Sequence, residues 1–109
     1  METVILLKII WLHLIGDFLF QSDKIAINKS SSFKYLGIHC LIYSLPLLLI
    51  SPLFAAINSI FHFVIDFCSS QLTTYFYKNK QRHWFFVTIG FDQAIHFTIL
   101  ILSYQLLGI

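Results

Sequence analysis

The chain has 109 residues, enough for one domain, and 58% of them are hydrophobic while only 11% are charged. Soluble domains carry charge on about a quarter of their residues, so this composition, with a mean hydropathy of +0.80, indicates an integral membrane protein. The formal charge of +2 is too small to suggest nucleic acid as a partner.

Four apolar stretches predict four membrane helices, which span about residues 3–20, 35–50, 53–75 and 84–107. A membrane helix needs about 20 mostly apolar residues. The third and fourth stretches fit this length. The second is short, so we expect it to tilt, to start earlier or to sit in a thinned bilayer. The sequence therefore predicts an all-α fold, a four-helix transmembrane bundle that forms a single integral membrane domain over residues 1–109.

The connections between these helices differ in kind. Residues 21–34 form a polar loop, and residues 78–83 form a short basic loop. The link Ser51-Pro52 is tight, which predicts an antiparallel hairpin of the second and third helices. Pro46 should kink the second helix or end its regular hydrogen bonding. Gly16 and Gly37 could each let a neighbouring helix approach closely.

The basic residues predict how the bundle is oriented. Six of the seven Lys and Arg residues lie in the two polar loops, namely Lys24, Lys29, Lys34, Lys78, Lys80 and Arg82, and only Lys8 lies elsewhere. Because basic loops remain on the cytoplasmic side, we expect both loops to be cytoplasmic and both termini to lie on the non-cytoplasmic side. Membrane lipids are the expected partners of such a chain.

Seven ionisable side chains lie inside the apolar stretches: His13, Asp17, His39, His62, Asp66, Asp92 and His96. A charge at the bilayer centre costs about 2.5–3.5 kcal/mol on insertion scales, so chance placement explains seven of them poorly. Three of the stretches carry a His and an Asp four residues apart. Residues four apart share one face of a helix, and all seven fall at similar depths. We therefore expect one polar site inside the bundle.

Imidazole nitrogen and carboxylate oxygen suit divalent transition metals. Three ionised aspartates would carry a charge of about −3, which is untenable in a low dielectric without cations. The sequence thus predicts a site for zinc, manganese or iron, with one or two ions held by the seven residues. Gln21, Asn58 and Gln93 are expected to hydrogen-bond to the ligands and orient them.

Two other interpretations of the same residues stay open. His/Asp chains also serve proton and ion pathways, and intramembrane polar side chains also join helices to one another. Cys40 and Cys68 each stand alone in an apolar stretch and are expected to be small buried residues. Lys24 and Lys29 are candidates to bind an anionic headgroup or phosphate at the mouth of the site.

The motifs resemble those of an uncharacterised family of small bacterial membrane proteins, known as a domain of unknown function. They are H-x3-D-F-x2-Q at residues 13–21, then His39, N-x3-H-x3-D at residues 58–66, and D-Q-x2-H at residues 92–96. The resemblance implies a multi-pass protein of the bacterial inner membrane and no established activity. The chain is more distantly similar to membrane-bound metal-dependent hydrolases, which also place His and Asp on transmembrane helices.

The leading hypothesis is a metal-dependent membrane hydrolase that acts on a lipid-like or phosphorylated substrate at the cytoplasmic side. The carboxylates of Asp17, Asp66 and Asp92 are the candidate catalytic groups, and one that does not bind metal would act as general base. The alternatives are a component of a proton or divalent-metal transporter, and a structural or accessory membrane protein. A four-helix transporter would need to form a homo-oligomer to enclose a path.

Overall fold

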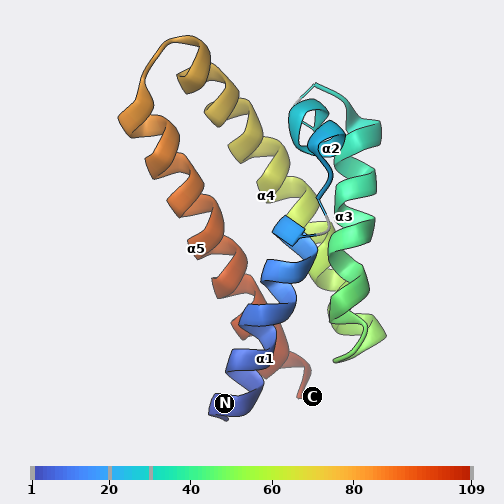
Figure 1. Ribbon diagram of the computed structural model, residues 1–109. Helices are drawn as coiled ribbons and strands as arrows, with labels where there is room; N and C mark the ends of the chain where they lie inside the picture. The colour runs from blue at the N-terminus through green and yellow to red at the C-terminus, as the bar shows by residue number, and fades with distance from the viewer. Residues whose placement is uncertain (1, 20, 30, 109) are drawn as a thin grey trace.

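The computed structural model describes residues 2–19, 21–29 and 31–108, which are helical and contain no strand (Figure 1). The elements in chain order are α1 (Thr3–Leu14), the π-helical turn η1 (Ile15–Leu19), α2 (Asp23–Asn28), α3 (Phe33–Leu47), α4 (Pro52–Lys78) and α5 (Arg82–Leu107). The predicted all-α fold is confirmed. The predicted end of the first helix, Phe20, lies outside the described residues.

The N-terminal third differs from the predicted helix and loop. The first helix is not α-helical throughout, because it widens into the π-helical turn η1 at Ile15. The expected polar loop contains the short helix α2, which begins after Ser22. The Ser22 hydroxyl accepts a hydrogen bond from the backbone N–H of Ile25 at 3.3 Å, as a helix N-cap does. Six residues are too few to show a helical period in the sequence.

The second predicted helix, residues 35–50, is displaced towards the N-terminus. Helix α3 begins at Phe33 and ends at Leu47, one residue after Pro46. The tight link at Ser51-Pro52 is confirmed: the Ser51 hydroxyl caps α4 by accepting from the N–H of Phe54 at 3.3 Å. Pro at the first helical position needs no N–H donor, so this dipeptide starts α4 sharply.

Helices α4 and α5 are long and apolar enough to cross a membrane. Their 27 and 26 residues give each a length of about 40 Å, against about 30 Å for the hydrocarbon core of a bilayer. The turn between them contains Lys80 with a φ of 57°. Helix α5 ends at Gly108, whose φ of 66° is the left-handed conformation that glycine favours.

The helices pack around α4, which contacts both α3 and α5 (Figure 1). Helix α1 packs against α3 and α5 at the end where both chain termini lie, while α2 packs on α3 near the opposite end. An apolar core fills the terminal end of the molecule. Its buried members are Ile9, Leu12, Tyr43, Leu47, Phe54, Ala55 and Leu100.

The rest of the interior is polar, while much of the surface is apolar. Among the described residues, as many polar or charged residues as hydrophobic ones are buried. Large hydrophobic side chains are exposed along the helices, with Val4, Leu49 and Leu106 at 71%, 71% and 85%. This distribution is the reverse of that in a soluble domain, so the outer surface suits lipid and the centre suits polar chemistry.

Candidate metal centre

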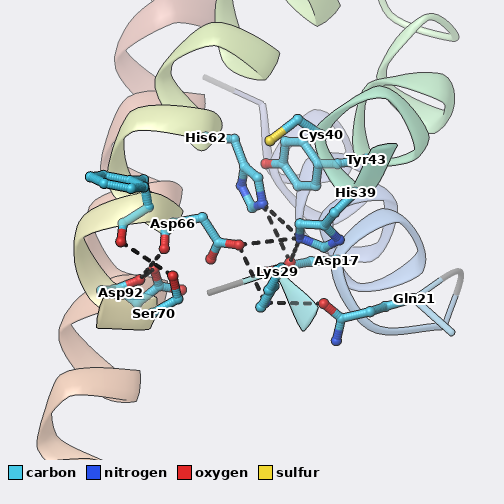
Figure 2. Close-up of polar contacts among 12 residues, drawn as sticks. Asp17, Gln21, Lys29, His39, Cys40, Tyr43, His62, Asp66, Ser70 and Asp92 are labelled. Atoms are coloured by element: carbon cyan, nitrogen blue, oxygen red, sulfur yellow. Dashed lines mark hydrogen bonds and ion pairs between the residues drawn. The ribbon is translucent and has the colours of Figure 1, made fainter. Parts of the chain in front are cut away.

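The seven ionisable residues of the apolar stretches meet between the helices, and none of them is more than 8% exposed. Five elements supply them: His13 from α1, Asp17 from η1, His39 from α3, His62 and Asp66 from α4, and Asp92 and His96 from α5. Figure 2 shows the side chains of His39, His62, Asp17 and Asp66 pointing toward one another. The expectation of one shared polar site is therefore met by the geometry.

A close contact of backbones places Asp17 beside His39. A Cβ atom on Gly16 would lie 2.8 Å from the carbonyl oxygen of Tyr43, so only glycine allows η1 and α3 to approach this closely. The π-helical turn is a second local feature, since single π-helical turns within helices are frequently found at functional sites. Gly37, by contrast, would place a Cβ with nothing within 4 Å, so the close approach expected there is absent.

The tightest convergence is at the Nε2 atom of His39. This atom lies 3.0 Å from Asp17 Oδ1, 3.0 Å from His62 Nε2 and 3.6 Å from Asp66 Oδ2. Asp17 Oδ1 is 3.5 Å from His62 Nε2. Four ligand atoms around a tetrahedral ion at 2.0–2.1 Å would be separated by about 3.3 Å. The ligand atoms of Asp17, His39 and His62, which are 3.0, 3.0 and 3.5 Å from one another, therefore have about the spacing that a zinc-like ion requires, and Asp66 Oδ2 lies beside them, 3.6 Å from His39 Nε2.

Three groups of residues bring ligand atoms within 4.8 Å of one another: Asp17 with His39 and His62, His62 with Asp66 and His96, and Asp17 with Asp92 and His96. Together they contain six of the seven predicted ligands. Asp17, His62 and His96 each belong to two groups. The groups thus form one continuous cluster of ligands rather than three separate sites.

Asp92 and His96 form a close pair on one face of α5. Asp92 Oδ1 lies 3.2 Å from His96 Nε2. Both atoms are buried and adjacent, so both could act as ligands of one ion. The rings of Tyr43, His62 and His96 stack in that order, with centroid separations of 3.9 and 4.2 Å, and this fixes the planes of the two imidazoles.

His13 is placed differently from the other predicted ligands and lies outside the three groups. Its Nδ1 is 3.0 Å from the Tyr43 hydroxyl, and its Nε2 is 2.8 Å from Gln93 Oε1. The amide nitrogen of Gln93 donates to Asp92 Oδ2 at 3.0 Å and to Asp17 Oδ2 at 3.3 Å. Because the amide oxygen must accept, His13 donates from Nε2. In this structure His13 orients Gln93, which in turn ties two carboxylates together.

The remaining Nδ1 atoms of His39 and His62 are buried and have no hydrogen-bond partner among the described residues. The contacts of both rings with the cluster are made through Nε2.

A cavity of about 350 Å³ adjoins the cluster and is lined by both polar and apolar side chains. The three aspartates, Gln93 and three hydroxyl residues of α4 contribute polar groups. Phe18, Phe85 and Ile89 contribute apolar surface. Lys29 reaches in from the end of α2: its Nζ lies 3.2 Å from Asp66 Oδ2 and 3.0 Å from Gln21 Oε1 (Figure 2). The cavity thus offers a cation, carboxylates and apolar surface to one occupant.

Some of the other predicted residues line the cavity and some lie outside it. Gln21 lines the cavity and holds Lys29 rather than a ligand. Asn58 donates to the Phe54 carbonyl and to the Ser103 hydroxyl, each at 2.9 Å, so it joins α4 to α5 below the cluster. The Lys24 ammonium lies 5.6 Å from the centroid of the Tyr35 ring. Only Lys29 of the two predicted lysines lines the described cavity.

Two side chains that hydrogen-bond to the predicted ligands were not singled out from the sequence. The Tyr43 hydroxyl contacts His13, and the Ser69 hydroxyl donates to Asp92 Oδ1 at 2.5 Å. Each lies three or four residues from a recognised site residue on the same helix, Tyr43 from His39 and Ser69 from Asp66. That spacing, which placed the seven ionisable residues on shared faces, is the signal that could have identified both.

The chain belongs to a family of proteins of unknown function, DUF3307, whose family model matches residues 5–109. The resemblance seen in the motifs is thereby confirmed at the level of the family. No curated protein and no solved structure matches the chain.

Proposed function

We propose that this protein is a metal-dependent hydrolase embedded in the cell membrane, acting on a phosphorylated lipid-like substrate from the cytoplasmic side. The observation that carries the proposal is the convergence of His39, His62, Asp17 and Asp66 on one point inside the fold. Helix-joining polar residues need partners, but they do not need several nitrogen and oxygen ligands at the mutual spacing of a coordination shell.

The membrane setting is the first part of the proposal. Four spans, α1 with η1, α3, α4 and α5, would form a multi-pass bundle with both termini on the non-cytoplasmic side. Support comes from the exposed apolar surface, from the length of α4 and α5 and from the position of both termini at one end of the molecule. The basic loops at the other end would then face the cytoplasm.

The adjoining cavity supports a hydrolytic reaction rather than a storage site. A divalent ion bound by these ligands would activate a water molecule at neutral pH and polarise a phosphoryl oxygen. The Lys29 ammonium would bind the anionic group of the substrate. On binding, it would give up its contact with the Asp66 carboxylate. Asp92 lines the same cavity, and the hydrogen bond from the Ser69 hydroxyl fixes the orientation of its carboxylate there.

The apolar surface of the cavity supports a lipid-like substrate. Phe18 is 47% exposed and Ile89 is 37% exposed, so both also contribute to the outer apolar surface. A headgroup could contact the polar groups of the cavity while its hydrocarbon chain remained along this apolar surface. A volume of about 350 Å³ is at the lower end of ligand pockets, about 300–1,000 Å³, and fits a headgroup rather than a whole lipid.

The test is phosphate release by detergent-purified protein from phosphatidic acid in mixed micelles and from water-soluble p-nitrophenyl phosphate. We expect release from the lipid only, loss after chelation, and recovery with zinc, manganese or iron(II). Asp66→Asn should abolish it, while His83→Ala, a change at the exposed start of α5, should not. Turnover that survives chelation, or the absence of turnover in metal-loaded protein over a panel of phospholipids, would contradict the proposal.

A further inference from the structure

We infer that the cluster holds two divalent ions, with the carboxylate of Asp17 as the bridge between them. The inference rests on the proposed function, because it presupposes that the cluster binds metal, and it specifies how many ions the hydrolase uses. It assigns one ion to Asp17, His39, His62 and Asp66, and a second ion to Asp17, Asp92 and His96.

The two oxygens of Asp17 face different partners. Oδ1 lies 3.0 Å from His39 Nε2 and 3.5 Å from His62 Nε2. Oδ2 lies 3.3 Å from Gln93 Nε2 on α5, and 3.5 Å from His13 Nε2 on α1. A carboxylate that binds one ion through both oxygens turns them to the same side, whereas a bridging carboxylate turns each oxygen to a different set of groups. The two oxygens of Asp17 contact different sets of groups, which is compatible with the second arrangement.

The ligand count also exceeds what one ion takes. Six residues offer ligand atoms in the three groups, while zinc in proteins is almost always four-coordinate. The group of Asp17, His39 and His62 and the group of Asp17, Asp92 and His96 share only Asp17. The second group supplies three ligands, which is the number that catalytic zinc sites use, with a further position for water or substrate, while Asp66 beside His39 brings the first ion to four ligands.

Gln93 positions the two halves relative to each other. Its amide nitrogen donates both to Asp17 Oδ2 and to Asp92 Oδ2. This leaves Asp92 Oδ1 on the side of His96 Nε2, at 3.2 Å. One amide therefore sets the spacing of the bridging carboxylate and a carboxylate of the second ion, and His13 fixes the orientation of that amide.

The charges favour an anionic substrate for the two-ion form. Three carboxylates against the one ammonium of Lys29 leave a surplus of two negative charges. One divalent ion neutralises this surplus, and a second reverses it to two positive charges, which a phosphate group can neutralise. Paired ions about 3.5–4 Å apart stabilise the attacking and the leaving oxygen in phosphoryl transfer, so a two-ion centre is the form suited to a phosphate ester.

The test is a cobalt(II) titration of the detergent-purified protein, followed by visible absorption and electron paramagnetic resonance. We expect two equivalents in the wild type, with spectra that show magnetic coupling at full loading. His39→Ala and Asp92→Asn each alter only one half, so each should bind one equivalent without coupling. Asp17→Asn should lose the coupling. His83→Ala is the control, and circular dichroism checks that each variant is folded.

The outcomes separate this inference from the proposed function. One equivalent in the wild type would overturn the two-ion centre and leave a one-ion hydrolase. No bound cobalt, zinc or manganese would overturn both. Two equivalents without magnetic coupling, unchanged by Asp17→Asn, would overturn the bridging role of Asp17.

Discussion

The two ends of the helix bundle are closed by different kinds of packing. At the terminal end, Ile9, Leu47, Phe54 and Leu100 are fully buried and fill the space with apolar side chains alone. Toward the loop end, the same four helices meet through histidines, aspartates and Gln93. The polar end gathers three carboxylates around a cavity, and in the proposed metal centre bound cations would offset this concentration of negative charge.

From this comparison we expect that the polar site is not required to hold the helices together. Helix α4 contributes Phe54 and Ala55 to one end, and His62 and Asp66 to the other. At the apolar end, the same helices pack through hydrocarbon side chains. Joining helices therefore does not by itself explain why histidines and aspartates are used at the polar end. Changes at the two ends should therefore affect different properties, stability at one and metal affinity at the other.

The largest effect is expected at the apolar end. Phe54→Ala removes a ring that is fully buried between the helices, and such changes cost about 3–5 kcal/mol of the free energy of unfolding. Unfolding in a sodium dodecyl sulfate titration, followed by circular dichroism, measures this cost. The number of metal equivalents in the folded fraction should not change. A loss of metal at unchanged stability would contradict the division between the two ends.

The next effect is expected where the two ends meet. Gly16→Ala would place a methyl group 2.8 Å from the Tyr43 carbonyl oxygen, so α3 must move away from η1. Such overpacking costs about 1–3 kcal/mol of the free energy of unfolding, and metal affinity should fall as well because Asp17 and His39 separate. Gly37→Ala is the matched control, since nothing lies within 4 Å of the added Cβ. Equal behaviour of the two variants would exclude the close contact.

A smaller effect, confined to the polar end, is expected from Gln93→Leu. The change removes the amide that donates to Asp17 and Asp92 and leaves His13 Nε2 without its acceptor. Loss of groups that orient metal ligands lowers metal affinity by about 10–100-fold. Competition with a fluorescent zinc chelator measures this. Gln105→Leu, an exposed change near the end of α5, should leave the affinity as it is.

The smallest effect is expected from the two lysines, Lys24 and Lys29, that the sequence predicted to share one anion-binding role. Lys29 contacts Asp66 and lines the cavity, whereas Lys24 packs over Tyr35. Lys29→Gln removes a charged hydrogen-bond donor that is still partly exposed, so we expect KM for an anionic substrate to rise about fivefold, a loss of about 1 kcal/mol. Lys24→Gln should leave KM unchanged. A larger effect from Lys24 would place the anion outside the cavity.

Much of the site could be predicted because helical spacing is a local property. The pairs four residues apart placed His62 and Asp66, and Asp92 and His96, on shared faces, and their similar depth in the apolar stretches predicted that these faces meet. The all-helical fold and the tight turn before Pro52 followed from equally local signals.

The remainder depends on how helices rotate and approach, which spacing does not determine. His13 fits the same pattern as His62, yet in the structure its two nitrogens contact Tyr43 and Gln93. The π-helical turn that carries Asp17 has no sequence period of its own. Gly16 and Gly37 are equivalent in the sequence, but only Gly16 faces a backbone. Helix α2 mattered because it presents Lys29, and a helix of six residues is too short to recognise from a pattern.

The central claim is that the polar end of the bundle is a metal centre. Elemental analysis of detergent-purified wild-type protein beside Asp66→Asn, after incubation with zinc, manganese and iron(II) and removal of the excess, tests it most directly. The account predicts at least one equivalent of transition metal in the wild type and a substantial loss in the variant, with both proteins equally helical. No metal in either protein, or the same metal content in both, would contradict it.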